Sequence, residues 1–212
     1  MTAAQGPAQG PARGRGRPRD PETDAAILAA ALELFVERGV EGTSMEQVAK
    51  RAGVGKLTLY RRWSSKEDLL AQAIEQWVRA EVTPSAAEVY ALEPRDLIER
   101  VLPAAAEMAA STGFRALVAR IMGSAVSHPA LMEVYWRHYI LPRRELAAAM
   151  LRRAQQDGLV AVDADLDVLI DMMAGAVTYR VLQPDPPDAT EMLRYLRAVY
   201  RQAGLYPPPE EK

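Results

Sequence analysis

Cysteine is absent from the 212 residues of this chain, which excludes disulfide bonds and thiolate metal sites and gives no reason to expect an oxidising compartment. Apolar runs are interrupted by Arg, Glu or Asp before they reach about 18 residues, so we expect no segment to span a bilayer. The N-terminus also lacks the apolar core of a secretion signal. By default, we expect a cytoplasmic protein with no membrane partner.

The residues that catalysis or metal binding requires are also scarce. The two histidines, His128 and His138, come without cysteine or clustered carboxylates, so we expect them at the surface or at helix boundaries. No Ser, His and acid pattern indicates a catalytic triad, and no glycine-rich phosphate loop occurs. We therefore expect no catalytic residue, no cofactor, no metal site and no enzymatic activity.

What the chain does contain is typical of a helical globular protein. Hydrophobic residues make up 49% and charged residues 25%, and the length allows one large or two modest domains with a real core. No β-type alternation of useful length and no internal repeat occurs, whereas apolar residues recur at helical spacing, which predicts an all-α fold of about nine helices. The expected helices are at about 24–38, 44–52, 56–63, 66–82, 94–111, 114–127, 129–156, 163–183 and 188–203.

Capping signals set the boundaries of the first helices. Gly39 is expected to end the first helix. Thr43 with Glu46 three residues later predicts a capping box for the second helix, and Ser65 with Asp68 predicts the cap of the fourth.

Charge is distributed unevenly although the net charge is only −2. Residues 1–66 hold 11 Lys/Arg and 7 Asp/Glu, for a net charge of +4, whereas the remainder holds 15 and 21, for a net charge of −6. A basic front suits a protein that meets a polyanion at one end. The alternative is a random distribution of surface charge.

Residues 43–70 indicate two short helices joined by a tight turn at Gly53, with a further helix starting at once, which is the arrangement of a helix-turn-helix DNA reader. The small core that holds the two helices is expected to consist of Val48, Ala49, Val54 and Leu59. Side chains on or near the exposed side offer donors to phosphates and bases. The residues on or near that side are Lys56, Leu57, Thr58, Tyr60, Arg61 and Arg62, of which all but Leu57 carry donors, and Lys66 is a further phosphate partner. The helix N-termini at Ser44 and Ser65 add backbone N–H groups that favour an anion.

These residues carry a family resemblance. The string Gly42-Thr43-Ser44-Met45, then Val48-Ala49, then AGVGKLTLYRRWSSKEDLL over residues 52–70, strongly resembles the TetR family of bacterial repressors. The preceding helix, with Leu34-Phe35 and Gly39, is also similar, so the resemblance covers about residues 22–70. It implies a small N-terminal DNA-binding domain, a larger helical domain that binds ligand and dimerises, and a homodimer on a palindromic operator of double-stranded DNA.

The resemblance also implies roles for individual residues. Backbone contacts are implied for Thr43, Lys56, Thr58, Tyr60 and Lys66, and variable base readout for Leu57, Arg61 and Arg62. Two positions depart from the family pattern. Gly55 stands where a Ser cap is usual, which weakens the cap by only a few tenths of a kcal/mol. Leu57 stands where a small residue is common, which suggests apolar contact with a thymine methyl group.

Some of these residues have structural alternatives. Trp63 is expected in the core or at a hinge against the fourth helix rather than on a base. Arg62 either contacts phosphate or forms an internal salt bridge to an acidic partner such as Glu67. Tyr60 is expected to be functional, given its neighbours.

The first residues form a basic arm, whose Arg13-Gly-Arg-Gly-Arg-Pro-Arg19 stretch resembles the Arg-Gly-Arg-Pro core of AT-hook peptides. We expect Arg15 and Arg17 to enter an A·T-rich minor groove, the alternative being a solubilising tail. The predicted organisation is then a disordered basic arm (1–20), a helix-turn-helix domain (21–66), a ligand-binding and dimerisation domain (67–206) and a loose tail (207–212).

The larger domain offers soft apolar residues at helical spacing, which fit either a plain core or a pocket between helices. The candidate pocket residues are Met108, Phe114, Leu117, Ile121, Met122, Trp136, Tyr139, Met172 and Tyr179. The last two helices are the candidates for a four-helix dimer interface, through Leu166, Leu169, Met173, Ala176, Met192, Leu193, Leu196 and Tyr200.

These observations predict a ligand-responsive transcriptional repressor that a small apolar or aromatic effector of low charge releases from its operator. The helix at about 66–82 links both regions and is the expected lever between two dimer states. The first alternative is an architectural DNA-binding protein without an inducer. The second is a helical enzyme or ligand carrier with a vestigial DNA-binding segment, which the missing catalytic groups disfavour.

Overall fold

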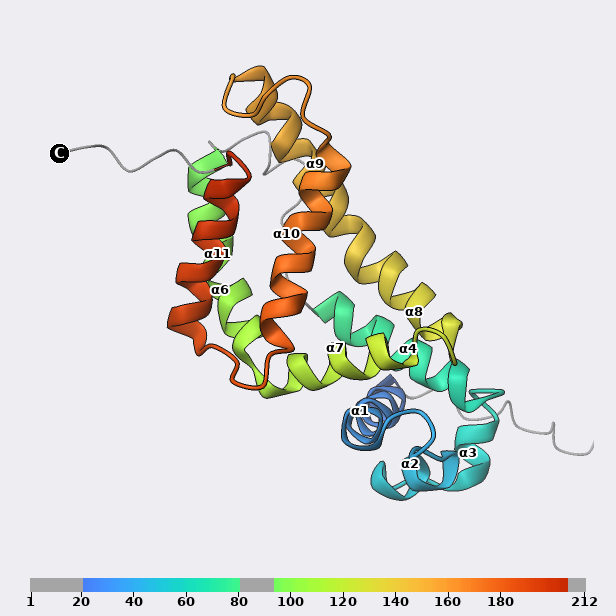
Figure 1. Ribbon diagram of the computed structural model, residues 1–212. Coiled ribbons are helices and arrows are strands. Elements are labelled where there is room, and N and C mark those ends of the chain that lie inside the picture. The colour runs from blue at the N-terminus through green and yellow to red at the C-terminus, as the bar shows by residue number, and fades with distance from the viewer. Residues whose placement is uncertain (1–20, 81–93, 206–212) are drawn as a thin grey trace, which may run out of the picture.

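A computed structural model describes residues 21–80 and 94–205 (Figure 1). The basic arm with Arg15 and Arg17, the end of the helix expected at residue 82, and the tail at 207–212 lie outside the described residues. All regular structure in the described ranges is helical, which confirms the all-α prediction. In chain order the helices are α1 (Pro21–Arg38), α2 (Met45–Arg51), α3 (Lys56–Tyr60), α4 (Lys66–Ala80), α6 (Pro94–Ala110), α7 (Thr112–Ser124), α8 (Pro129–Tyr135), the π-helical turn η1 (Trp136–Ile140), α9 (Leu141–Gln156), α10 (Leu166–Val181) and α11 (Ala189–Gln202).

The helices form two regions joined by α4. Helices α1, α2 and α3 lie together at one end of the molecule and are called the head below (Figure 1). Helices α6 to α11 form the remainder, called the body, in which α11 packs along α6. Helix α4 starts directly after the head and packs against both α1 and α8. None of the helices in the described ranges combines the length and the apolarity that crossing a bilayer requires.

The cap of α2 lies one residue later than the sequence predicted. Ser44, not Thr43, is the N-cap residue: its hydroxyl accepts a hydrogen bond from the backbone N–H of Gln47, and the Gln47 side chain accepts one from the backbone N–H of Ser44. Both positions of this capping box therefore shift by one from the predicted Thr43 and Glu46. The shift has a physical reason, since the Thr43 hydroxyl donates 2.7 Å to the carbonyl oxygen of Gly39 instead.

Other boundaries differ by a few residues. The helix predicted at 56–63 ends at Tyr60, with Arg61 as its C-cap residue. The helix predicted at 163–183 starts at Leu166, because the Asp165 carboxylate accepts hydrogen bonds from two backbone N–H groups of its first turn. The helix predicted at 129–156 is continuous in direction but passes through the π-helical turn η1.

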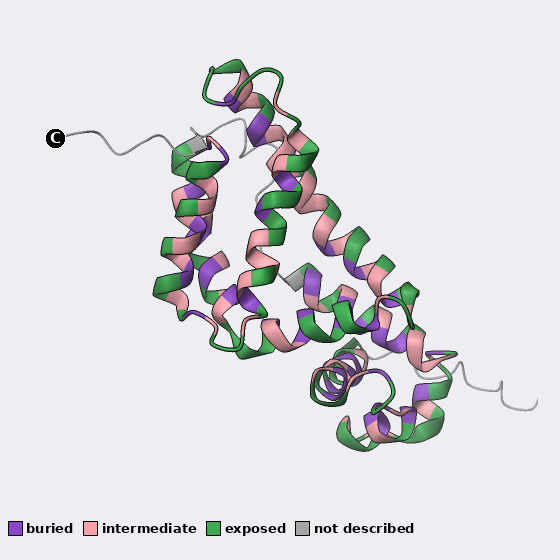
Figure 2. Cartoon of the chain, viewed as in Figure 1, coloured by how far each residue is buried: buried purple, intermediate pink, exposed green. Residues whose placement is uncertain are grey.

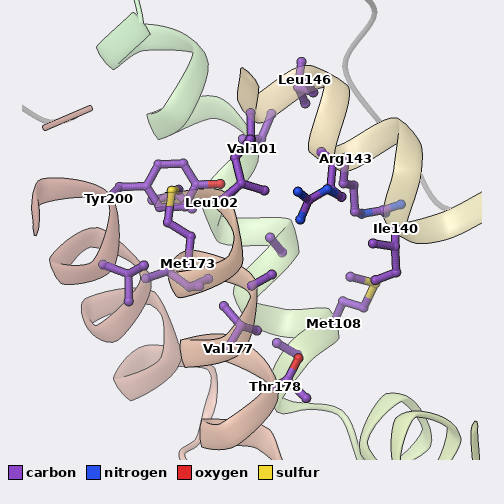
Figure 3. A pocket seen from close by; sticks show the side chains of 18 of the residues that line it. Val101, Leu102, Met108, Ile140, Arg143, Leu146, Met173, Val177, Thr178 and Tyr200 are labelled. Atoms are coloured by element: carbon purple, nitrogen blue, oxygen red, sulfur yellow. The ribbon is translucent and has the colours of Figure 1, made fainter. Parts of the chain in front are cut away.

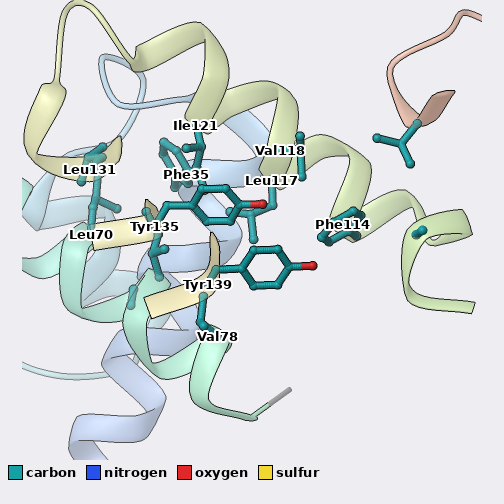
Figure 4. Close-up of a cluster of buried hydrophobic side chains, with 14 of the residues drawn as sticks. Phe35, Leu70, Val78, Phe114, Leu117, Val118, Ile121, Leu131, Tyr135 and Tyr139 are labelled. Carbon is teal, nitrogen blue, oxygen red and sulfur yellow. The ribbon is translucent and has the colours of Figure 1, made fainter. Parts of the chain in front are cut away.

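The apolar core runs without interruption from head to body (Figure 4). Phe35 on α1 lies near Ile121 on α7, and Leu70 on α4 lies near Leu131 on α8. All four side chains are almost completely buried. Head and body therefore share one apolar core.

Candidate nucleic-acid interface and ligand cavity

The turn between α2 and α3 fixes the angle of the two helices. Gly53 has a φ of +67°, a conformation that glycine adopts without strain. The backbone N–H of Val54 then donates 3.0 Å to the carbonyl oxygen of Ala49. Val48 and Leu59 are fully buried between the helices, as the sequence predicted. A five-residue helix is thus held in place by a single buried side chain of its own, Leu59.

The outer side of α3 presents both apolar surface and hydrogen-bond donors. Leu57 is 64% exposed and Tyr60 is 50% exposed, and Lys56 and Arg61 are also exposed. Thr58 is half-buried. This surface has the composition that a helix needs to contact phosphates and base edges.

One carboxylate, Glu46 on α2, interacts with two of these donors. The Tyr60 hydroxyl donates to Glu46 over 3.3 Å, and the Lys56 ammonium lies 3.6 Å from the same oxygen. The pKa of Glu46 is lowered, first by a backbone hydrogen bond and then by the charge of Lys56, so the group is ionised at neutral pH. Partial desolvation and this carboxylate raise the pKa of Tyr60, which therefore stays protonated. Glu46 therefore engages both donors in the single chain.

Three predicted contact residues are held inside the head. Thr43 is buried and bonded to Gly39, as described above. The Lys66 ammonium donates 2.9 Å to the carbonyl oxygen of Val40 and so fixes the turn before α2. Arg62 forms an ion pair with Asp24 on α1, which supports the structural alternative for this arginine but with a different partner from Glu67.

The remaining predicted residues of this segment have defined structural roles. Trp63 is buried and its indole N–H donates to the side chain of Gln72 on α4, as expected for a core residue at this junction. Ser44 caps α2, and Ser65 accepts from the backbone N–H of Asp68 at the start of α4, as predicted. Helix α4 is therefore attached to α3 through the short segment that contains Trp63.

A second attachment, which the sequence did not reveal, joins the head to α7. The Arg120 guanidinium donates to two carbonyl oxygens at the end of α1, over 3.1 Å to Val36 and 2.8 Å to Glu37. The His128 ring nitrogen Nε2 lies 3.2 Å from a carboxylate oxygen of Glu41 in the turn after α1. No local pattern marks Arg120, because its partners lie more than 80 residues earlier in the chain.

The body contains a cavity of about 540 Å³ between α6, α7, η1, α9, α10 and α11 (Figure 3). Its volume lies in the range typical of small-molecule sites. Of the predicted pocket residues, Met108, Phe114 and Tyr139 line it, whereas Leu117 and Ile121 are buried in the core outside its lining. The others are exposed at the surface of the single chain, namely Met122, Trp136, Met172 and Tyr179.

The residues predicted for the dimer interface are also divided. Met173, Leu196 and Tyr200 line the cavity, and Met192 is fully buried. The other four are half-buried, namely Leu166, Leu169, Ala176 and Leu193. The two faces of α10 are thus exchanged relative to the prediction, which placed Met172 in the pocket and Met173 in the dimer interface. Met172 faces outward and Met173 faces the cavity. Both faces of α10 are apolar, so the sequence does not specify which one meets the cavity.

Helix α10 carries exposed residues along its length (Figure 2), and several of them are large and apolar. Met172 is 64% exposed and Tyr179 is 72% exposed, and they share one face of the helix with Gly175. Val168 and Leu182 extend this face at either end and are also exposed. These residues form the outward apolar face of α10, which is uncovered in the single chain.

An aromatic cluster connects the cavity with α4. The ring of Trp77 on α4 lies 6.1 Å from that of Phe114 and 6.0 Å from that of Tyr139, measured between centroids. Tyr139 also stacks on Tyr135 at 4.9 Å. Phe114, Tyr135 and Tyr139 line the cavity, whereas Trp77 lies behind them. A molecule in the cavity would therefore contact rings that pack directly on the helix leading to the head.

A short helix with exposed donors, carried by a glycine turn and joined to a body with a cavity, defines a helix-turn-helix transcriptional regulator. The comparisons agree. The family model described as "Bacterial regulatory proteins, tetR family" matches residues 27–73, and "Tetracyclin repressor-like, C-terminal domain" matches residues 94–199. The chain belongs to the TetR family of bacterial transcriptional regulators.

Similar proteins support this assignment over most of the chain. The DNA-binding transcriptional repressor TetR of Mycobacteroides abscessus is 30% identical over 166 residues, which are 77% of this chain and 84% of the relative. The HTH-type transcriptional regulator YdeS of Bacillus subtilis is 29% identical over 159 residues, or 74% of this chain and 77% of the relative. A regulator from Saccharomonospora viridis, solved in complex with choline, shares the fold with a TM-score of 0.69 at 19% identity, covering 86% of this chain and 97% of the other.

Proposed function

We propose that this protein is a ligand-responsive repressor that binds a palindromic operator as a homodimer and releases it when a small molecule enters the cavity. The observation that carries the proposal is the aromatic cluster, because it places the cavity wall directly against the helix that positions the head. The exposed donors of α3 supply the DNA surface. The expected absence of enzymatic activity agrees with relatives that are named as transcriptional regulators.

The DNA surface consists of the exposed part of the predicted set. Lys56 and Tyr60 would bind phosphates, and Leu57, Arg61 and Thr58 would face the bases and their sugars. Ser44 presents the N-terminus of α2 to the backbone. Thr43, Arg62 and Lys66 support this surface from within the head. The arm with Arg15 and Arg17 stays proposed as a minor-groove contact.

The outward apolar face of α10 supports the proposed homodimer. Two such faces from two copies would cover each other, and two heads that read one side of the duplex must then lie about 34 Å apart. The repressor TetR named above and the other relatives belong to a family whose members usually act as dimers. A single α3 contacts too few base pairs to bind an operator tightly and specifically, so a second head is required.

The proposed release mechanism is a population shift. Helix α4 packs on α1 in the head and on α8 in the body, so a change at Phe114 or Tyr139 moves it through Trp77. One state holds the two heads at operator spacing and the other does not. A ligand that prefers the second state by a few kcal/mol would empty the operator.

Selection of bound DNA from a random pool tests this function. A palindrome with half-sites about one helical turn apart is expected. The matched variants are Lys56→Ala with Tyr60→Phe, expected to weaken operator binding by at least about tenfold, and Arg194→Ala at an exposed position of α11, expected to leave it within about twofold. Binding without a sequence preference and without release by any ligand would instead indicate an architectural DNA-binding protein.

A further inference from the structure

The cavity has a polar end that its apolar walls do not explain. Figure 3 shows Arg143 of α9 and Tyr200 of α11 entering the cavity from opposite sides and pointing toward each other. The walls around them are aliphatic, including Val101, Ile140 and Val177. A guanidinium among apolar side chains favours an anionic partner, because an unpaired charge in such surroundings is costly.

Arg143 is oriented but not neutralised. Its Cζ atom lies 3.7 Å from the centroid of the Tyr139 ring, and one of its amino groups donates 3.3 Å to the carbonyl oxygen of Tyr139. It forms no ion pair with any acidic residue among those the structure describes. A guanidinium has five N–H donors in a fixed plane, so most of them are available to a bound molecule.

The neighbouring arginine shows the contrast. Arg144 also borders the cavity, but its guanidinium forms ion pairs with two carboxylates of α10, Asp171 and, at 3.1 Å, Asp167. Its charge is therefore already compensated by the protein. The difference between adjacent residues of one helix makes Arg143 the candidate recognition residue and Arg144 its matched control.

No acidic side chain belongs to the described lining of the cavity. Within the part of the chain that the structure describes, the lining holds no Asp or Glu, so no acidic side chain of the wall compensates Arg143. Burial raises the pKa of the Tyr200 hydroxyl, and the nearby Arg143 offsets this only in part, so Tyr200 remains a hydrogen-bond donor at neutral pH. A guanidinium and a phenol that face each other form a donor pair for one carboxylate group.

We propose that the cavity binds an apolar molecule that carries a single carboxylate, with Arg143 pairing the carboxylate and Tyr200 donating a hydrogen bond to it. This inference rests on the proposed function, since it names the chemical class of the effector for the same cavity. It revises the sequence-based expectation of an effector of low charge. It also distinguishes this cavity from a site for a quaternary ammonium ion, which the uncompensated guanidinium would repel.

Isothermal titration calorimetry of the full chain, without DNA, tests the proposal with three probes of equal chain length: decanoate, decan-1-ol and decylamine. The wild-type protein should bind decanoate at least about tenfold more tightly than the alcohol, and the amine least tightly. Arg143→Gln should reduce the preference for decanoate over decanol to about twofold, and Tyr200→Phe should weaken decanoate binding about threefold. Arg144→Gln should retain the wild-type preference.

Equal affinity for decanoate and decanol, no binding of decanoate, or an unchanged preference in Arg143→Gln would each overturn the proposal. Far-UV circular dichroism verifies that Arg143→Gln is folded, and Tyr200→Phe, which keeps the aromatic ring, provides an independent variant if it is not. The experiment contains no DNA, so its failure leaves the regulator function intact. The failure of that function would show separately in the operator selection.

Discussion

At the scale of single residues, Gly42 shows how closely the turn after α1 is packed. A Cβ atom at this position would lie 2.6 Å from the carbonyl oxygen of Arg38 and 2.6 Å from its Cβ atom, distances that no side chain can occupy. Gly113, near the start of α7, is exposed, and a Cβ atom added there would have no neighbouring atom within 4 Å. The two glycines therefore predict opposite responses to the same substitution.

Gly42→Ala should lower the free energy of unfolding by about 1–3 kcal/mol, because the backbone of the turn must shift to admit the methyl group. Gly113→Ala should be neutral or raise it by up to about 1 kcal/mol, since alanine favours the helix. Urea denaturation followed by circular dichroism measures both. Equal effects of the two substitutions would show that the close approach at Gly42 is relieved without cost.

Glu46 holds two of the donors that we assign to DNA, so its removal should strengthen DNA binding. Glu46→Gln is expected to increase operator affinity about threefold, because one negative charge next to the phosphates disappears. Glu145→Gln, which makes the same charge change at an exposed position of α9, is the control and should have no effect. Fluorescence anisotropy with labelled operator measures both.

The same interaction predicts a pH dependence. The pKa of Glu46 lies below its ordinary value of 4.5, so the carboxylate is charged throughout the neutral range. The advantage of Glu46→Gln should therefore be constant near neutrality and shrink only as the pH falls through this lowered pKa. An advantage that vanished already near pH 6 would contradict the assignment of the effect to Glu46.

At the scale of elements, helix α4 joins the cavity wall to the head. Its Trp77 packs on the two cavity rings, and its first turn follows the segment that holds α3. The sequence predicted the existence of this helix and its cap at Ser65 from local signals. It did not predict the contacts of Arg120 with α1, because residues distant in the chain are brought together only by the packing of whole helices.

Trp77→Leu should uncouple the cavity from the head. Decanoate should still bind in calorimetry, and operator affinity without ligand should stay within about twofold, while the decanoate-induced loss of operator affinity falls by about tenfold. Trp136→Leu, at a half-exposed position on η1 outside the cavity lining, is the matched control and should keep the response. Unchanged coupling in Trp77→Leu would remove the aromatic cluster from the mechanism.

At the scale of the whole molecule, the sequence predicted the helical class and the head more accurately than it predicted which sides of the body helices face inward. Glycine turns and caps act locally, so Gly53 and Ser65 are where their patterns place them. Helix α10 is apolar on more than one side, and only its packing against α9 and α11 determines that Met173 turns inward and Met172 outward. That arrangement transfers the expected dimer contact to the outward apolar face of α10.

Met172→Glu should therefore produce a monomer, because two carboxylates would meet across the twofold axis in an apolar interface. Sedimentation velocity should show one chain mass instead of two, and operator affinity should fall by at least about tenfold because each chain then binds one half-site. Met122→Glu on α7, also an exposed methionine, should remain dimeric. A dimeric Met172→Glu protein would place the interface elsewhere.

The shortness of α3, which has five residues, has one further consequence. Only Leu59 of α3 is buried, whereas Leu57 and, directly after the helix, Arg61 are exposed. In the proposed function these two positions face the bases, so substitutions there are expected to change the operator sequence that is bound, with little effect on the stability of the head. A duplicated gene would then acquire new operator targets through a few surface substitutions, while the cavity of the body keeps its ligand specificity.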